Sequence, residues 1–418
     1  MIYVNDAYFG EAFFAERFQA FSRHEVLANC KGKRIALCSS NPAYILALCL
    51  YLKEHGGSFY PIHADMPRLA AKRLAVKAQC HALMIETEQQ CYPLGRTESD
   101  TEAVLVQTSS GTTGDPKVIC RPWSSIEQEL TSYTSAFTVP NSMTPVIACP
   151  VTHSYGLIAG VLVALKRGQI PLIINQLNPK YLIKVLQQTP NHLLYSSPAL
   201  LQSVASLYPA SQRLHAVMTS GTLLSKACFE LLLSRAEHVF QQYGCSEVGC
   251  IAINSKTESA ENLGAILPHL QVQAGGNAKE PEEVIVRVGE QTIFTRDLGY
   301  FDHQQHLCFV SRVDDTINVA GLNVYPKDVE DAVLELPSVS EAVVFKRKDS
   351  LAGEKVCLQF VADEALPPSR IRSWCQTRLA AYQLPVEVEQ VAEIEKLPNG
   401  KVNRKALAET AVAIPALG

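Results

Sequence analysis

The chain has 418 residues, of which 47% are hydrophobic and 19% are charged. This balance is ordinary for a globular enzyme, and the length is sufficient for a sizeable core and two or three domains. The net charge of −4 argues against a protein that binds nucleic acid.

The amino-terminal sequence and the apolar runs give no sign of export or of a membrane span. No basic region precedes an apolar segment at the amino terminus, so we expect no signal peptide. The apolar runs 44–52 and 157–165 are shorter than a membrane span requires. The thirteen cysteines form no Cys-x-x-Cys pair, and several lie in apolar runs, which suits a reducing compartment. We therefore predict a cytoplasmic protein with no membrane partner.

The pattern of apolar residues predicts an alternation of strands and helices from residue 13 to residue 244. The predicted strands cover 33–38, 58–62, 81–85, 103–106, 144–149, 170–174, 193–195, 216–219 and 238–241. The predicted helices cover 13–28, 41–55, 67–79, 124–137, 156–166, 179–188, 198–206 and 226–234. Such an alternation implies βαβ units and parallel sheets, which is the α/β class.

The pattern changes after residue 263. From 263 to 308 the predicted strands are short and separated by turns, which is typical of a small antiparallel sheet or β-barrel-like subdomain. The charged segment 312–315 is the predicted boundary between a large amino-terminal domain, 1–311, and a small α+β domain, 312–418. In the second domain we predict helices at 326–336 and 368–379 and strands at 339–346, 355–361 and 386–391.

A loop rich in glycine and hydroxyl groups follows the apolar strand at 103–106. Glycines let backbone N–H groups converge on an anion, and hydroxyls and a lysine add donors, so the loop suits a polyphosphate. A plain surface turn is the alternative. The spacing excludes the P-loop of ATPases and kinases, because only two residues separate Gly111 from Gly114. The candidate residues are Thr108, Ser109, Ser110, Gly111, Thr112, Thr113, Gly114 and Lys117.

Two further segments carry groups that suit a nucleotide. Residues 243–247 follow a predicted strand, at the sheet edge where α/β proteins bind ligands. There Tyr243 could lie against a purine, Ser246 could donate to a phosphate, and Glu247 could hold Mg²⁺ through carboxylate oxygens. The carboxylate of Asp297 could accept hydrogen bonds from both ribose hydroxyls. Taken alone, each segment is also consistent with an ordinary surface turn.

The loop at 108–117 closely resembles the phosphate loop of the adenylate-forming superfamily. That superfamily includes acyl- and aryl-CoA ligases, luciferases and the adenylation domains of peptide synthetases. Five motifs resemble it in the same order, and the resemblance extends from Lys33 to Leu407. It implies that ATP, Mg²⁺ and the phosphopantetheine thiol of CoA or a carrier protein take part, and that the carboxy-terminal domain is mobile.

The resemblance also implies roles for single residues. Asp314 would be the hinge of the mobile domain, and Lys401 would bridge the carboxylate and the α-phosphate. Arg296 stands where the superfamily usually has glycine. Besides residues 109–114, the residues implied to contact ATP are Ser220, Gly221, Thr222, Tyr243, Gly244, Cys245, Ser246, Asp297 and Arg312.

The segment 150–156 resembles the Pro-x-x-His-x-x-Gly segment of the aryl- and acyl-acid branches of the superfamily. The amino-acid-activating branch has an aspartate in this neighbourhood, which this chain lacks. The resemblance therefore implies a carboxylic acid without an α-amino group, held in an apolar cavity. The residues predicted to line that pocket are His153, Tyr155, Met218, Cys245, Val248, Gly249 and Cys250.

The resemblance implies adenylation followed by thiol transfer. A carboxylate attacks the α-phosphorus of ATP, pyrophosphate leaves, and the acyl-adenylate passes its acyl group to a thiol. Positive charge and positioning lower the barrier because two anions must meet. The compact chain favours a carrier protein over CoA as the acceptor. An amino-acid-activating enzyme and an inactive nucleotide-binding protein of the same fold are the alternatives. The catalytic residues predicted on this basis are Thr108, Lys117, His153, Glu247 and Lys401.

Overall fold

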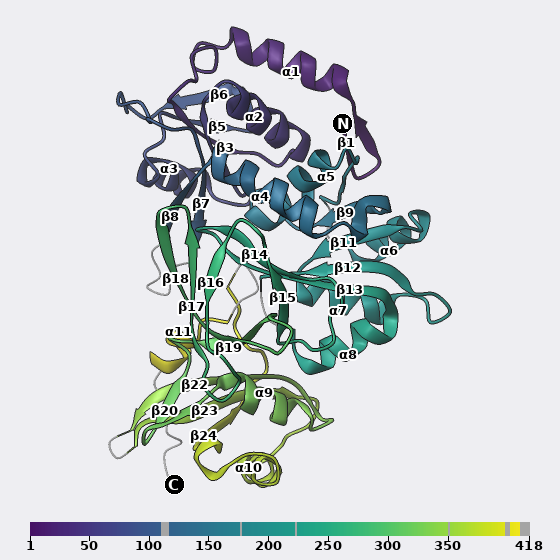
Figure 1. Cartoon of the computed structure of the whole chain (residues 1–418), viewed down its shortest axis with the longest axis vertical. Coiled ribbons are helices and arrows are strands. Elements are labelled where there is room, and N and C mark those ends of the chain that lie inside the picture. The colour runs from purple at the N-terminus through teal and green to yellow at the C-terminus, as the bar shows by residue number, and fades with distance from the viewer. Residues whose placement is uncertain (110–116, 176–177, 222–223, 350–351, 398–401, 410–418) are drawn as a thin grey trace. The chain divides into compact units, whose positions relative to one another are not determined.

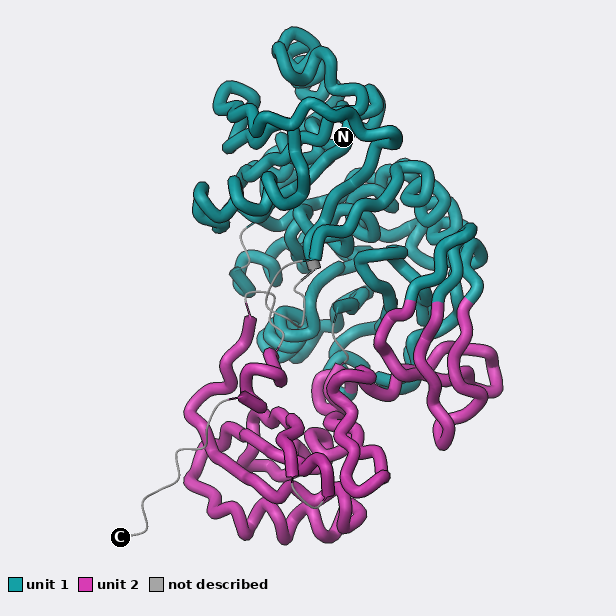
Figure 2. Tube along the Cα trace, turned by 90° about the vertical axis from the view of Figure 1, so that its left-hand side faces the viewer, with its two compact units in different colours: residues 1–223, 230–271, 286–293 teal, residues 224–229, 272–285, 294–418 magenta. Residues whose placement is uncertain are grey.

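The computed structural model describes residues 1–109, 117–175, 178–221, 224–349, 352–397 and 402–409. The chain divides into two compact units, which Figure 2 colours separately. The first unit comprises residues 1–223, 230–271 and 286–293, and the second comprises residues 224–229, 272–285 and 294–418. No helix among the described residues is long and apolar enough to cross a membrane.

One sheet of the first unit has the strand order β6-β5-β3-β4-β7-β8 (Figure 1). Strand β3 is parallel to β4 and β5, and β4 is parallel to β7, whereas β6 and β8 are antiparallel to their neighbours. Strand β4 is buried along its whole length, which explains its continuous apolar sequence. The strands are β3 (Arg34–Cys38), β4 (Ser58–Ile62), β5 (Ala82–Ile85), β6 (Thr87–Pro93), β7 (Val104–Ser109) and β8 (Lys117–Pro122).

The larger sheet of the first unit has the order β15-β14-β13-β12-β11-β9-β10-β1-β2. Strands β9 to β13 are parallel to one another, so their carboxyl ends lie at one edge. Strands β14 and β15 continue the sheet in antiparallel fashion. The strands are β1 (Ile2–Val4), β2 (Ala7–Phe9), β9 (Thr144–Ala148), β10 (Leu172–Ile173), β11 (His192–Ser196), β12 (Leu214–Thr219), β13 (Ala236–Cys245), β14 (Gly249–Asn254) and β15 (Asn262–Ile266).

Helices connect these parallel strands. Asn41 begins α2, because its side chain accepts hydrogen bonds from the backbone N–H groups of Ala43 and Tyr44. Helix α4 contacts β8 of the smaller sheet and β14 of the larger one, so it links the two sheets. The helices are α1 (Glu11–Arg23), α2 (Pro42–Glu54), α3 (Arg68–Lys77), α4 (Trp123–Ala136), η1 (Val139–Ser142), η2 (Tyr155–Leu162), α5 (Val163–Lys166), α6 (Pro179–Gln188), α7 (Pro198–Leu207) and α8 (Lys226–Arg235), which has residues of both units.

The second unit contains the sheet β21-β20-β23-β22, with β24 beside β23. It also contains β19 and most of the residues of β16, β17 and β18, whose remaining residues belong to the first unit; these four strands pair in the order β16-β17-β18-β19. Helices α9 and α10 contribute Val329, Val333 and Ile371 to a buried core with Val344 and Phe360 of the sheet. The strands are β16 (Gln271–Gln273), β17 (Glu282–Val288), β18 (Gln291–Phe301), β19 (Leu307–Arg312), β20 (Ile317–Val319), β21 (Leu322–Val324), β22 (Val339–Asp349), β23 (Gly353–Ala362) and β24 (Glu387–Gln390). The helices are α9 (Pro326–Leu334), α10 (Pro368–Gln376), η3 (Ala381–Gln383) and α11 (Arg404–Glu409).

The predicted fold class is confirmed, since parallel sheets are followed by short antiparallel strands and an α+β segment. The strands that were not predicted are β1, β2, β6, β8, β14, β20 and β21. The predicted helix at 156–166 is present, but its first part, η2, is a π-helix and only residues 163–166 are α-helical. The division into domains 1–311 and 312–418 stays a prediction.

All thirteen cysteines are free thiols. Nine of them are buried, and burial raises the pKa of Cys49, for example, to about 12. Cys120, in β8, is exposed. Most of the cysteines therefore act as small apolar side chains in the core.

Asp100 joins the first residues of β3 and β4. Its carboxylate accepts hydrogen bonds from Nε of Arg34 at 3.1 Å, from Oγ of Ser58 at 3.0 Å and from Nη2 of Arg96 at 2.9 Å. Burial alone would raise the pKa of Asp100, but the charge of Arg34 and these hydrogen bonds lower it below its ordinary value. Asp100 is therefore ionised in the folded protein at neutral pH.

Replacing Asp100 with asparagine is expected to lower the free energy of unfolding by about 3 kcal/mol at neutral pH, because Arg34 loses its buried partner. The contribution of the carboxylate is complete above the unfolded pKa of about 3.9 and is lost as the pH falls through the lower folded pKa. Urea unfolding of parent and variant across this range measures the difference. If the difference in unfolding free energy between parent and variant stayed constant down to about pH 2, the stabilising role of the ionised Asp100 carboxylate would be contradicted.

Candidate active site

The predicted segment 243–247 forms the end of β13 and the start of the turn into β14. Across this hairpin Gly244 pairs with Cys250, and Cys245 pairs with Gly249. Residues 246–248 make the turn. Because β13 is parallel to β12 and extends beyond it, the turn lies at the carboxyl edge of the parallel strands, as the sequence predicted.

Two glycines allow the close packing of this hairpin, Gly244 within the hairpin and Gly249 against its neighbours. A Cβ atom at Gly244 would lie 2.1 Å from the carbonyl oxygen of Gly249, so no other residue fits without moving the backbone. Gly249 has a φ of +85°, and a Cβ atom there would lie 2.3 Å from Oε2 of Glu129 and 2.5 Å from Nη1 of Arg121. The hairpin is therefore packed tightly against itself and against a charged pair.

Lys117 and Glu247, both predicted to act near the phosphates, lie together. The Lys117 ammonium donates a hydrogen bond of 3.1 Å to Oε1 of Glu247. Their side chains are 66% and 27% exposed, so this ion pair contributes little to stability. Ser109, the last residue of β7, is the backbone partner of Lys117. The two ends of the predicted phosphate loop are thus held side by side and next to Glu247.

Glu247 also fits the predicted role in holding Mg²⁺. Its carboxylate supplies the oxygen ligands that this hard cation prefers, and part of the side chain is accessible to solvent. A different group of donors, one atom each from His215, Glu237 and His238, lies within 4.8 Å of one another in the described part of the chain. That group is near the amino ends of β12 and β13, and imidazole ligands suit transition metals instead of Mg²⁺.

A buried ion pair next to the hairpin was not predicted from the sequence. Arg121 in β8 and Glu129 in α4 are each 2% exposed, and Nη2 of the arginine donates a 2.7 Å hydrogen bond to Oε2 of the glutamate. Oε1 of Glu129 accepts the backbone N–H of Cys250, also at 2.7 Å. The sequence did contain a signal, because Glu129 lies in the apolar stripe of α4 with Ile126 and Tyr133, where a carboxylate needs a partner.

The residues predicted for the acid pocket fall into two groups. Tyr155 and Met218 are in contact, because the tyrosine hydroxyl donates a 2.6 Å hydrogen bond to the carbonyl oxygen of Met218 in β12. Burial raises the pKa of Tyr155 well above its ordinary value, so the hydroxyl stays protonated. The second group lies in and beside the β13–β14 turn and comprises Cys245, Val248, Gly249 and Cys250.

His153 lies just before the π-helix η2. Its side chain is exposed by area, but nearby protein atoms reduce the hydration of the ring and, with His63 as a second cause, lower the pKa of His153. The neutral imidazole is therefore favoured at neutral pH. Three residues later, a Cβ atom at Gly156 would lie 2.3 Å from the carbonyl oxygen of Pro150, which explains the glycine that ends this motif.

Asp297 and Arg312 face each other across β18 and β19 in the second unit. Nη1 of Arg312 lies 3.1 Å from Oδ1 of Asp297, whose side chain is mostly buried. The neighbouring Arg296 has a φ of +63°, a conformation that favours glycine and explains the glycine usual in the superfamily. The Arg296 guanidinium donates a 2.7 Å hydrogen bond to Asp314, the predicted hinge.

The remaining predicted residues lie at strand ends or outside the described residues. Thr108 accepts a 3.4 Å hydrogen bond from the hydroxyl of Tyr60. Ser220 and Gly221 directly follow β12, and Gly221 has a φ of +92°. Their roles stay predictions. The predicted residues outside the described part of the chain are Ser110, Gly111, Thr112, Thr113, Gly114, Thr222 and Lys401.

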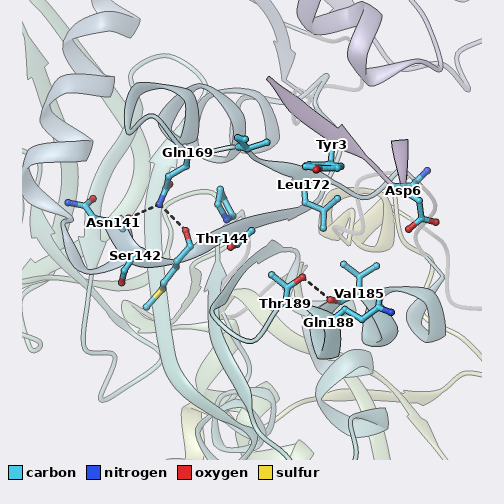
Figure 3. Close-up of a pocket in the computed structure, with 14 residues that line it drawn as sticks. Tyr3, Asp6, Asn141, Ser142, Thr144, Gln169, Leu172, Val185, Gln188 and Thr189 are labelled. Atoms are coloured by element: carbon cyan, nitrogen blue, oxygen red, sulfur yellow. Dashed lines mark hydrogen bonds between the residues drawn. The ribbon is translucent and has the colours of Figure 1, made fainter. Parts of the chain in front are cut away.

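An open cavity of about 560 Å³ lies elsewhere in the first unit (Figure 3). Thr144 and Leu172, at the starts of β9 and β10, line it, so it lies at the amino edge of the parallel strands. The amide of Gln169 in its wall is already engaged, donating to the carbonyl oxygens of residues 140, 141 and 143. None of the residues predicted for the acid pocket lines this cavity, so it is a separate feature.

Comparison with known proteins identifies the family. The AMP-binding enzyme family matches residues 63–290, and the AMP-binding enzyme C-terminal domain matches residues 328–401. The chain is 38% identical over 408 residues to a 3,4-dihydroxybenzoate–[aryl-carrier protein] ligase of Bacillus anthracis, covering 97% of this chain and 98% of that protein. It is 23% identical to a 2-succinylbenzoate–CoA ligase of Listeria monocytogenes over 79% of this chain and 74% of that protein.

Solved structures show the same fold. The o-succinylbenzoate CoA synthetase of Bacillus subtilis, bound to its acyl-adenylate intermediate, superposes with a TM-score of 0.84 at 18% identity. ATP-bound MatB of Rhodopseudomonas palustris gives a TM-score of 0.84 at 15% identity. Each comparison covers 98% of this chain and 95% of the other.

The chain belongs to the AMP-binding enzyme family. It is an AMP-forming acid–thiol ligase that adenylates a carboxylic acid of the aryl or acyl type with ATP. The acyl group then passes to the phosphopantetheine thiol of CoA or of a carrier protein. The o-succinylbenzoate CoA synthetase of Bacillus subtilis, 18% identical, has also been solved in complex with ATP and a magnesium ion. The activity and the use of ATP predicted from the sequence are confirmed.

Replacing Gly244 with alanine is expected to destabilise the protein by about 1–3 kcal/mol and to reduce adenylation, because the added carbon atom forces β13 and β14 apart. Gly276→Ala is the matched control, since a Cβ atom there meets nothing within 4 Å. Thermal unfolding and pyrophosphate release measure the two effects. If both variants unfolded at the same temperature and released pyrophosphate at the same rate, the protein would tolerate a wider spacing between β13 and β14.

Proposed function

We propose that the acid is a dihydroxybenzoate and that the acceptor thiol belongs to an aryl carrier protein. The observation that carries this proposal is the relationship to the Bacillus anthracis ligase, which extends over 97% of this chain. The CoA ligase of Listeria monocytogenes is more distant and is matched over less of its length. A substrate without an α-amino group also agrees with the absence of a carboxylate among the residues predicted to line the pocket.

In the first unit, the proposed nucleotide contacts come from the end of β13 in the larger sheet and from the chain between β7 and β8 of the smaller sheet. Lys117 and the hydroxyl and amide groups of residues 108–114 bind phosphate oxygens, and Tyr243 lies against the adenine. Glu247 holds Mg²⁺, which supplies positive charge to the phosphates when bound. The contact between Lys117 and Glu247 supports this arrangement, because it brings together the ammonium group proposed to bind the phosphates and the carboxylate proposed to hold Mg²⁺.

The proposed acid-binding groups are His153, Tyr155 and the walls formed by Met218 and by residues 245–250. The hydrogen bond from Tyr155 to the backbone of Met218 supports a fixed, apolar wall on one side. The tight β13–β14 hairpin supports a second wall. An aromatic ring suits such a site, because flat apolar surfaces bury its faces while few polar groups are needed to orient it.

Roles in the second unit are proposed from the sequence alone. Asp297 accepts hydrogen bonds from the ribose, Arg312 binds the ribose or a phosphate, and Lys401 meets the carboxylate and the α-phosphate. Asp314 is the proposed hinge between domains 1–311 and 312–418. The ion pair between Arg296 and Asp314 is exposed and therefore weak, which is compatible with a hinge that must rearrange.

These groups account for both half-reactions. Cationic side chains such as Lys117 reduce the repulsion between the carboxylate and the triphosphate, and the fixed pocket aligns the carboxylate with the α-phosphorus. Pyrophosphate leaves as the carboxylate oxygen bonds to phosphorus. The thiol then attacks the carbonyl carbon of the acyl-adenylate, AMP leaves, and the thiol proton is released to a base.

ATP–pyrophosphate exchange across an acid panel tests the proposed substrate. Dihydroxybenzoates are expected to exceed benzoate, cinnamates and fatty acids by at least about tenfold in kcat/KM, since hydroxyl contacts add discrimination. α-Amino acids are expected to give no exchange. Thioester formation on a phosphopantetheinylated aryl carrier protein is then compared with that on CoA. Exchange with α-amino acids alone, or transfer to CoA alone, would overturn the proposal.

Replacing Glu247 with glutamine is expected to lower kcat about 10²- to 10³-fold and to raise the Mg²⁺ concentration needed for half-maximal rate. The reason is that the amide is a weaker ligand than the carboxylate. Glu237→Gln makes the same chemical change on the exposed opposite edge and is expected to behave like the parent. If Glu247→Gln kept the parent's Mg²⁺ dependence, Glu247 would not be the metal ligand.

A cytoplasmic location is part of the proposal. Thirteen free cysteines support it, because thiols persist in a reducing compartment.

A further inference from the structure

The Arg121–Glu129 pair contacts the β13–β14 hairpin at two adjacent residues. Oε1 of Glu129 accepts the N–H of Cys250, while Oε2 binds Arg121 and lies where a Cβ atom of residue 249 would be. Both carboxylate oxygens are therefore committed to fixed partners. The position of Glu129 determines where the backbone of residues 249 and 250 can lie.

Stability alone does not explain this pair. Burying two charges costs free energy that their mutual attraction often fails to recover, and apolar replacements of both partners are frequently as stable. In addition, Nε and Nη1 of Arg121 have no hydrogen-bond partner among the described residues. Each such buried donor carries a further cost of about 1–3 kcal/mol. Burying this pair therefore costs more free energy than apolar side chains would at the same place. The pair does, however, hold one backbone amide in a specific position.

The same helix holds the hairpin at a second point that serves as an internal comparison. The hydroxyl of Tyr133, four residues after Glu129 in α4, donates a 2.8 Å hydrogen bond to Oε1 of Gln242 in β13. Tyr133 and Gln242 are both buried. The contact of Tyr133 is with a residue inside β13, whereas the contact of Glu129 is at residues assigned to the acid pocket.

We propose that Glu129, oriented by Arg121, is a positioning residue that fixes the Gly249–Cys250 wall of the acid pocket and thereby sets discrimination among acids. This inference rests on the proposed function, since residues 249 and 250 form a pocket wall only under that proposal. Glu129 itself does not touch the reacting atoms. It acts through the backbone of the hairpin.

Two double variants isolate the hydrogen bond from the buried charge. In R121M/E129Q the amide oxygen can still accept the N–H of Cys250, and in R121M/E129L nothing can. Both variants lack the ion pair, and replacing both partners of a buried pair usually preserves folding. The conservative variant Y133F removes the comparison contact on the same helix.

The readouts are kcat and KM for the acid and for ATP, measured with the acids that the parent enzyme adenylates. R121M/E129L is expected to lose about 10- to 100-fold in kcat/KM for the preferred acid, with the KM for ATP nearly unchanged, because the displaced wall misaligns the acid. R121M/E129Q keeps an acceptor for the Cys250 N–H but lacks the orienting Arg121, so it is expected to lose clearly less than R121M/E129L does. Y133F is expected to lower the melting temperature without changing the preference among acids.

Equal acid kinetics in R121M/E129L and R121M/E129Q would overturn the inference, as would a parallel loss for acid and ATP. The comparison is independent of the identity of the acid. If the parent enzyme adenylates some acid other than a dihydroxybenzoate, the proposed substrate fails, while the two double variants still decide the role of Glu129.

Discussion

The backbones of β13 and β14 approach each other closely because Gly244 has no Cβ atom, and Gly249 leaves room for Glu129 and Arg121 against the hairpin. This constraint places the turn at residues 246–248 beyond the end of β12, where the parallel strands of the larger sheet finish. Glu247 reaches Lys117 from that turn, and Cys250 reaches Glu129 from the strand behind it. The groups assigned to phosphate and acid binding in the first unit therefore depend on one narrow hairpin.

A single strand of the other sheet meets this hairpin twice. Lys117 and Arg121 are four positions apart in β8, with three residues between them, so both side chains project from the same face of the strand. The first pairs with Glu247, and the second, through Glu129, supports Cys250. The exposed pair is weak because solvent screens it, whereas the buried pair is locked by its surroundings. One short strand thus supplies a weak contact and a rigid one.

The sequence predicted most of the fold because buried parallel strands and capped helices leave strong local patterns. Strand β4 and helix α6 were predicted at every residue. Strand β6 was missed because its polar residues match no apolar alternation, and β1 and β2 are only three residues each. The π-helix at 155–162 could not be distinguished from an α-helix, since it is buried nearly all round and shows no periodic face.

The site was predictable where a motif is local and unpredictable where partners are distant in the chain. Residues 243–247 were assigned from their order after a strand, and the structure places Glu247 beside Lys117, 130 residues away. The Arg121–Glu129 contact required knowing that β8, α4 and β14 meet, which no single segment reveals. Arg296 departs from the usual glycine, yet it adopts a positive φ and retains the local conformation.

Because the other cysteines are buried or partly covered, one exposed thiol is available for labelling with a spectroscopic probe. Nine thiols are enclosed in the core and three are partly covered, whereas Cys120 is open to solvent. It lies in β8 between Lys117 and Arg121, on the face opposite to theirs. A thiol-reactive fluorophore should therefore attach there first, on the same strand as Lys117, without removal of the other cysteines.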